Sequence, residues 1–299
     1  MNQRFFSPQE GFEMATYEWI ATNENQRLLI VHGMAEKGIR YERFAIEANK
    51  MGISVFALDL PGHGKTSERN GLRGSFGPNG WIGVAEAIES YAKSIASEGV
   101  HLALFGHSMG SILSLGVAER NKTGIKNFIL SAFPPHPGAL VHAGKIMGSF
   151  MGTLFGTEKA SPFMNNLTFG KFNKGIDAPR TDFDWLSRDP SEVDAYIKNP
   201  DCGEVFTIGF FTELARMTDW VHKNKKELKR ETHIHYIAGS NDPVVEKEAG
   251  TNKVIADFKA LNIQFSFKVY PEARHELLND TCRDEVTSDL IQLLMATKK

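Results

Sequence analysis

The chain has 299 residues, enough for one large α/β domain or for a core with an inserted subdomain. Its 41% hydrophobic and 23% charged residues are ordinary for a globular protein, and a net charge of −2 argues against nucleic-acid binding. Two cysteines cannot form a disulfide framework, and the amino terminus lacks the apolar stretch of a signal peptide. We therefore expect a cytoplasmic protein without a transmembrane segment, for which transient contact with a membrane surface stays open.

Short apolar runs alternate with helical patterns along the chain, which is typical of βαβ units and a mostly parallel sheet. The first expected strand covers residues 12–20 and is predicted to be antiparallel and near an edge of the sheet. Buried strands are expected over residues 28–31, 54–58, 102–105, 127–130, 233–238 and 264–270. Helices are expected over residues 81–97, 111–120, 206–222 and 283–295.

The strand rhythm stops after the expected strand at 127–130 and resumes only near residue 233. Between them lie a proline-rich turn, a stretch rich in glycine, methionine and phenylalanine, a polar segment and one helical pattern. The simplest account is a sheet core in two parts, residues 1–133 and 226–299, with a mainly helical cap over residues 134–225 inserted between two of its strands.

The clearest chemical signal is Gly106-His107-Ser108-Met109-Gly110, a G-x-S-x-G motif directly after a buried strand and before a helical stretch. In such a strand-to-helix turn the serine has a strained backbone and an exposed hydroxyl, and the flanking glycines avoid clashes. We therefore predict that Ser108 is a catalytic nucleophile.

A serine nucleophile needs a base, and the base needs a group that orients it. Asp242 lies in a turn bounded by glycine and proline after the strand at 233–238, and His275 follows the strand at 264–270. Sites in open α/β sheets gather at the carboxyl ends of strands. The order Ser108, Asp242, His275 predicts a catalytic triad, in which His275 is the base and Asp242 its partner.

The negative charge that develops on the substrate oxygen needs two fixed donors. We assign them to the backbone N–H groups of Met109, directly after the nucleophile, and of Met34, in the loop after the strand at 28–31. His32 and Gly33 of that loop, and His107 beside the nucleophile, are predicted to line the substrate site.

A second group of candidate substrate-binding residues lies in the expected cap. The stretch 138–155 carries Met147, Phe150 and Met151 among its apolar residues and is too short and too polar to span a membrane. Two interpretations stay open, because the stretch can be a helix packed inside the cap or an adaptable wall for an acyl chain.

The sequence favours no metal or nucleotide. His233 and His235 alternate on one strand face, but they have no cysteine or carboxylate partner at ligand spacing. There is no P-loop, and no G-x-G-x-x-G follows a strand. We predict that the protein uses no metal and no cofactor.

Taken together, these motifs resemble the α/β-hydrolases of the monoacylglycerol lipase and lysophospholipase group, which are grouped with the serine aminopeptidases. The resemblance covers nearly the whole chain and implies the α/β-hydrolase fold and a serine hydrolase without metal or cofactor. Its motifs are residues 32–36, 59–64, 106–110, 239–244 and 274–276, with 183–190, 193–196 and 201–203 in the expected cap.

Our hypothesis is hydrolysis of the ester of a fatty acid or similar acyl group, most plausibly a monoacylglycerol or a lysophospholipid. Other acyl substrates stay open, namely a thioester, a small ester or a peptide amino terminus, which the carboxylates Asp182, Asp184, Asp189 and Glu192 could hold. Perhydrolysis by the same triad and a non-catalytic ligand-binding protein also stay open. The sequence makes no prediction of oligomeric state.

Overall fold

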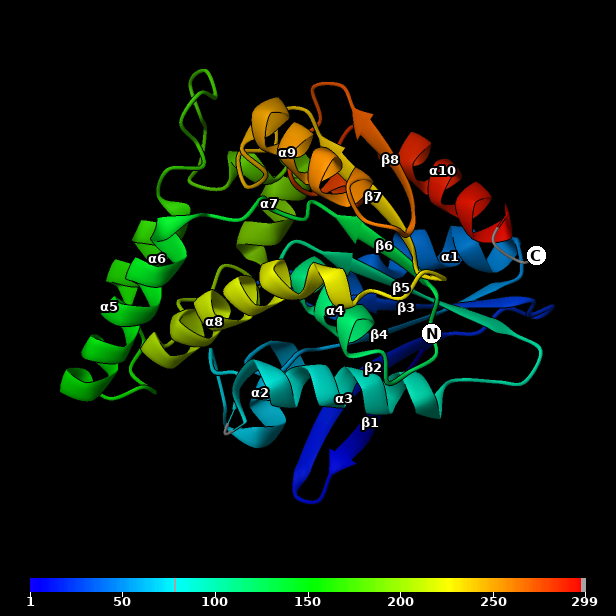
Figure 1. Ribbon diagram of the computed structural model, residues 1–299, viewed down its shortest axis with the longest axis horizontal. Coiled ribbons are helices and arrows are strands. Elements are labelled where there is room, and N and C mark those ends of the chain that lie inside the picture. Colours follow the sequence, from blue (N-terminus) through cyan, green and yellow to red (C-terminus); the bar gives the residue numbers. More distant parts are fainter. Residues whose placement is uncertain (78, 297–299) are drawn as a thin grey trace.

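A mostly parallel sheet of eight strands forms the centre of the molecule (Figure 1). The computed structural model describes residues 1–77 and 79–296. Strands β3 to β8 run parallel, whereas β2 is antiparallel to both of its neighbours, β1 and β4. In their order across the sheet the strands are β1 (Asn2–Gln9), β2 (Phe12–Trp19), β4 (Ile53–Leu58), β3 (Gln26–Val31), β5 (His101–His107), β6 (Asn127–Ser131), β7 (His233–Gly239) and β8 (Gln264–Tyr270).

Seven of these strands confirm the sequence prediction, as does the fold class. Strand β2 is antiparallel and second from the edge, as expected for residues 12–20. The edge strand β1 was not predicted. It pairs only with β2, and most of its residues are exposed, so its sequence lacks the apolar alternation that marks a half-buried strand.

Helices cover both faces of the sheet (Figure 1). On one face, α3, α4, α8 and α9 share a large apolar core with the strands, and on the other, α1 and α10 share a second core. Because both faces are covered, all six residues of β4 are buried, which explains its continuous apolar run. The helices outside the β6–β7 connection are η1 (Gly38–Tyr41), α1 (Glu42–Lys50), α2 (Gly64–Asn70), α3 (Gly80–Ser94), α4 (Met109–Arg120), α9 (Lys247–Lys259), η4 (Leu277–Asn279) and α10 (Arg283–Ala296).

Residues 132–232, here called the β6–β7 segment, add no strand to the sheet. They form α5 (Ala139–Phe155), α6 (Pro162–Phe169), η2 (Asp184–Leu186), α7 (Pro190–Lys198), α8 (Ile208–Asn224) and η3 (Lys225–Glu227). Helix α8 packs on the sheet's own helices: the rings of Trp220 and Trp81 lie 5.1 Å apart, and Val221 contacts Gly116 of α4. Helices α5 and α6 lie beyond α8, at the left of Figure 1.

The predicted helices over 81–97, 111–120, 206–222 and 283–295 are confirmed as α3, α4, α8 and α10. None of the helices formed by residues 1–77 and 79–296 is both long and apolar enough to cross a membrane.

Candidate active site

Ser108 occupies a sharp turn between β5 and α4. Its backbone angles are φ 53° and ψ −119°, a conformation that L-residues rarely adopt. The two glycines of the motif make the turn possible. A Cβ on Gly106 would lie 2.3 Å from the Gly110 carbonyl oxygen, and a Cβ on Gly110 would lie 2.1 Å from the Val31 carbonyl oxygen. The turn therefore fixes Ser108 at the start of α4, close to the carboxyl end of β3.

Asp242 and His275 meet at the carboxyl ends of β7 and β8. The His275 Nδ1 atom lies 2.8 Å from Asp242 Oδ2, and both side chains are buried. The other carboxylate oxygen of Asp242 accepts the backbone N–H of Val244 at 2.8 Å, which fixes the orientation of the carboxylate. The chain can cross here because position 239 is glycine: a Cβ on Gly239 would lie 2.2 Å from the Ala273 carbonyl oxygen.

The charge around His275 favours its protonated form. Burial alone would lower the pKa of His275, but the Asp242 carboxylate more than offsets burial and raises that pKa above its ordinary value. Because the Nδ1–H faces Asp242, the Nε2 atom is the one left to exchange a proton with a neighbour. His107, whose ring centre lies 4.7 Å from that of His275, has its pKa lowered to about 4 by burial and by His275 itself, so it is neutral at pH 7.

Ser108 and His275 line one cavity of about 290 Å³ at the carboxyl ends of the strands. Its walls are largely apolar and come from α4, α6, α8 and the loops after β3 and β6. Besides the site residues, apolar side chains and prolines that line it include Ile112, Pro134, Pro135, Pro137, Phe169, Phe172, Trp185, Leu186, Leu214 and Val244. Of the remaining predicted site residues, Gly33, Met34, His107 and Met109 also line this cavity.

The backbone N–H groups of Met34 and Met109 both belong to residues that line the cavity. Among the described residues, neither group donates a hydrogen bond to the protein. The loop that carries Met34 is firmly held. The Gly33 N–H donates to Glu36 Oε1 at 2.6 Å, and Ala35 has a positive φ of 62°. The Ala35 carbonyl accepts from the Tyr196 hydroxyl at 2.9 Å and from the Gly203 N–H at 3.1 Å.

A buried ion-pair cluster supports this loop, and the sequence analysis did not find it. Arg40 forms two bonds with the Glu276 carboxylate, at 2.6 and 2.7 Å, and a third with Glu36 at 3.1 Å. The Tyr41 hydroxyl donates to Glu36 at 3.0 Å. Burial alone would raise the pKa of Glu276, but Arg40 lowers it below the ordinary value, so this carboxylate is ionised. Glu276 directly precedes η4 and belongs to this cluster.

Four predicted substrate-binding residues lie outside the cavity. His32 is fully buried beneath the loop, where its Nε2 accepts the Leu60 N–H at 2.9 Å. Met147, Phe150 and Met151 lie on α5 and are not among the lining residues; Phe150 is 64% exposed. Because α5 is apolar around most of its circumference, sequence periodicity could not tell which face turns inward.

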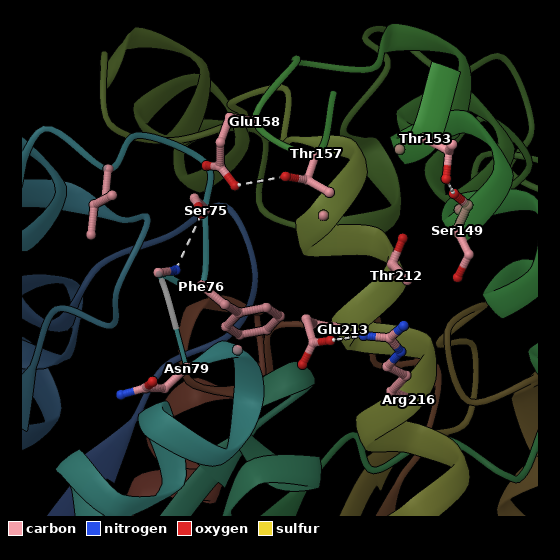
Figure 2. A pocket seen from close by; sticks show the side chains of 16 residues that line it. Ser75, Phe76, Asn79, Ser149, Thr153, Thr157, Glu158, Thr212, Glu213 and Arg216 are labelled. Atoms are coloured by element: carbon pink, nitrogen blue, oxygen red, sulfur yellow. Dashed lines mark hydrogen bonds and ion pairs between the residues drawn. The ribbon is translucent and has the colours of Figure 1, made fainter. Parts of the chain in front are cut away.

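A larger hollow of about 900 Å³ lies between α5, α8 and the loop before α3 (Figure 2). It contains none of the predicted catalytic residues and is lined by small and hydroxyl-bearing residues. Glu213 at its wall accepts the Trp81 N–H and an N–H of Arg216. Leu214 and Thr218 of α8 line the cavity that holds Ser108, whereas Thr212 and Glu213 line this hollow, so α8 separates the two.

His233 and His235 lie on β7, and the Nδ1 of His235 lies 2.5 Å from the Ser266 hydroxyl oxygen. Within residues 1–77 and 79–296, no three histidine, cysteine or acidic side chains come together as a metal site.

Comparison with known proteins supports the resemblance noted from the motifs. A family described as "Serine aminopeptidase, S33" matches residues 22–282. The chain is 25% identical to the monoglyceride lipase homolog of monkeypox virus, over 89% of this chain and 86% of the relative. It is 24% identical to the monoacylglycerol lipase of Mycolicibacterium smegmatis, over 89% and 88%. The structure of a carboxyl esterase from Bacillus coagulans superposes with a TM-score of 0.92 at 24% identity, covering 100% and 99% of the two chains, so the two share a fold.

Proposed function

Because this chain belongs to the serine aminopeptidase S33 family of α/β-hydrolases, we propose that it hydrolyses carboxylic esters through an acyl-enzyme on Ser108. The observation that carries the proposal is that His275 lines the same apolar cavity as the strained Ser108 and lies 2.8 Å from the buried Asp242 carboxylate. A nucleophile and a base in one cavity, with a carboxylate behind the base to orient it, are the parts that acyl transfer requires.

In this mechanism His275 Nε2 accepts the proton of Ser108 as the serine oxygen attacks the ester carbonyl. Asp242 stabilises the charged imidazole through Nδ1–H, and the N–H groups of Met34 and Met109 bind the oxyanion. The protonated His275 then donates to the leaving alcohol. Water, deprotonated by the same histidine, attacks the acyl-enzyme; the bond between the acyl carbon and the Ser108 oxygen breaks, His275 returns the proton to that oxygen, and the acid is released.

The substrate that fits the cavity best is an ester with a single acyl chain, such as a monoacylglycerol or a lysophospholipid. A volume of about 290 Å³ is at the small end for ligand sites, and the aromatic and proline side chains offer an apolar surface. Two of the relatives named above, described as a monoglyceride lipase homolog and a monoacylglycerol lipase, support the same substrate class.

A peptide amino terminus is less well supported. Among the described residues, three carboxylates line the cavity: Glu36 and Glu276 are both engaged by Arg40, and Glu246 forms an ion pair with Lys253 at 3.6 Å. None of the four acids suggested from sequence, Asp182 included, lines the cavity, and three of them have other partners: Asp184 bonds to Thr181, Asp189 to Arg283 and Glu192 to Arg43. A bound ammonium group would therefore compete with a cationic side chain for each carboxylate that lines the cavity.

We propose that the β6–β7 segment covers the site as a cap. We also propose that its outer helices, α5 and α6, contact a lipid surface. Residues 139–175 carry Lys145, Lys159, Lys171 and Lys174 against one acid, Glu158, so this region attracts anionic lipid. Thr168 and Phe169 of the same helix pair line the catalytic cavity. Seven large apolar side chains of α5 and α6 are each more than half exposed. They form what we call the apolar ridge: Leu140, Ile146, Phe150, Leu154, Phe155, Phe163 and Leu167.

We propose a cytoplasmic location, and the cysteines support it. Cys202 and Cys282 are both free thiols, which supports a reducing compartment such as the cytoplasm.

A series of p-nitrophenyl and glycerol esters of graded acyl length tests the proposal. We expect turnover to rise toward medium or long chains, and Ser108→Ala to lower kcat by a factor of thousands or more. A fluorophosphonate probe should label the wild type and not the variant. Unchanged hydrolysis in Ser108→Ala would refute the nucleophile, and lack of labelling would favour a ligand-binding protein.

A further inference from the structure

The loop that carries His275 is bonded directly to the β6–β7 segment. The His275 N–H donates to the Trp185 carbonyl at 3.4 Å, and the Glu276 N–H donates to the Leu186 carbonyl at 2.8 Å. These two bonds join the backbone on either side of the imidazole to η2 (Asp184–Leu186). The contact links residues about 90 positions apart, so the conformation of the β6–β7 segment and that of the catalytic histidine cannot vary independently.

Arg274, the residue before His275, adds side-chain hydrogen bonds to the same short helix. Its Nη1 atom donates to the Asp184 carbonyl at 2.7 Å and to the Ser187 carbonyl at 2.9 Å. The carbonyls at the end of a short helix have no partners within that helix, and a cationic donor satisfies them well. The Arg274 guanidinium thus binds η2 across its whole length, and it is not among the residues that line the cavity.

The segment held in this way confines the imidazole. The Trp185 ring centre lies 5.1 Å from that of His275, on which His107 also packs at 4.7 Å. Phe172 and Phe169 back the Trp185 ring at 4.8 and 6.0 Å. His275 is only 3% exposed as a result, so the ring has little freedom to leave Asp242.

We propose that Arg274 is a positioning residue, which keeps His275 in reach of Ser108 and Asp242 by locking residues 184–187 of the β6–β7 segment against the histidine loop. The proposal rests on the proposed function of the triad. Arg274 itself touches neither the substrate nor the reacting atoms. Its effect passes through the Trp185 ring and through the two backbone bonds at His275 and Glu276.

The test replaces Arg274 by Met, which keeps the length of the stem and removes both donors. We expect kcat for a short-chain ester to fall about 10- to 100-fold with KM within about twofold, because a small displacement of a catalytic group is costly. The downfield proton resonance of the His275–Asp242 hydrogen bond should broaden or disappear. A purely structural role of Arg274 would lower thermal stability and leave this resonance and kcat of the folded enzyme unchanged.

Arg283→Met is the matched control. Arg283 also joins the β6–β7 segment to the carboxyl-terminal part of the chain, through Asp189 at 2.7 Å, but it makes no bond to residues 184–187. We expect Arg283→Met to lose about as much thermal stability as Arg274→Met, while its kcat and the His275–Asp242 proton resonance stay as in the wild type. Equal losses of kcat in Arg274→Met and Arg283→Met would overturn the proposal.

If Arg274→Met does not fold, Arg274→Lys tests the positioning role of Arg274 instead. Lysine reaches one of the two carbonyls, so we expect a smaller loss of kcat, about several-fold, and a weakened resonance. Wild-type values of both in Arg274→Lys would contradict the proposal. Its failure is distinct from failure of the triad: if Ser108→Ala is inactive and the Arg274 variants are not impaired, only the role of Arg274 is refuted.

Discussion

Glu119, on the helix that begins after Ser108, provides a quantitative test of how burial changes the pKa of a carboxyl group and the stability of the fold. This carboxyl group lies in the last turn of α4, and both of its oxygens are buried without a hydrogen-bond partner in the described part of the chain. Burial raises the pKa of Glu119 to about 10, although Lys225 nearby acts in the opposite direction. In the folded protein at neutral pH the side chain is therefore an uncharged acid.

The sign and size of the effect follow from proton linkage. The ordinary pKa is 4.5, so above this pH the unfolded chain releases the Glu119 proton while the folded chain keeps it. The stability contributed by the neutral form is fully present below pH 4.5 and is lost as the pH rises toward 10. Between these two pH values the free energy of unfolding falls by about 1.4 kcal/mol per pH unit. At pH 7 it is therefore about 3 kcal/mol lower than at pH 4.5.

Glu119→Gln keeps the shape of the side chain and removes the proton equilibrium. We expect the free energy of unfolding of the variant, minus that of the wild type, to increase by about 3 kcal/mol between pH 4.5 and 7, and to increase further at pH 9. Urea unfolding followed by circular dichroism at the three pH values measures this difference. Glu47→Gln, the same substitution at an exposed position of α1, is the control for the change without burial. A difference for Glu119→Gln that does not change with pH would refute the reasoning.

Three further outcomes follow from the site, and one from the surface. Asp242→Asn should lower kcat by about 10⁴ in ester assays while the protein stays folded, because the imidazole loses its charge partner and its tautomer; a loss below tenfold would contradict the triad. The acidic limb of the kcat/KM profile should have its midpoint above pH 6.5, since Asp242 raises the pKa of His275 and only the neutral imidazole accepts the serine proton. Gly110→Ala should destabilise the protein by at least about 2 kcal/mol in thermal or urea unfolding, whereas Gly144→Ala, whose Cβ would have no neighbour closer than 3.7 Å, should not. Phe150→Ser should weaken sedimentation with phosphatidylglycerol vesicles, and equal binding of the variant and wild type would remove the apolar ridge as a lipid-contacting surface.

Much of the fold could be predicted because the central strands are buried on both faces. Such strands appear as continuous apolar runs, and those at β3, β4 and β5 were found within two residues of their observed ends. The edge strand β1 could not be found in this way, because exposure on an edge removes the apolar alternation. The face of α5 that turns inward was equally hidden, since its apolar residues surround most of the helix.

Some residues of the candidate site could likewise be predicted from the sequence, and others could not. Ser108, Asp242 and His275 could be named because each follows a recognisable strand, and glycine or proline marks the turns around them. The Arg40–Glu276 pair joins residues 236 positions apart, and nothing in either local sequence indicates the other. Arg274 was likewise only a residue beside a histidine until its two carbonyl partners on the β6–β7 segment were known.

The loop at Ala35 has a consequence for protein engineering. Its positive φ is maintained from outside the sheet, by the hydroxyl of Tyr196 and the N–H of Gly203, both of which belong to the β6–β7 segment. A chimera that exchanges this segment for that of a relative, in order to change acyl selectivity, would also exchange the supports of the loop that presents the Met34 N–H. Such a transplant must carry equivalents of Tyr196 and Gly203, since the same piece of chain both lines the cavity and holds this loop.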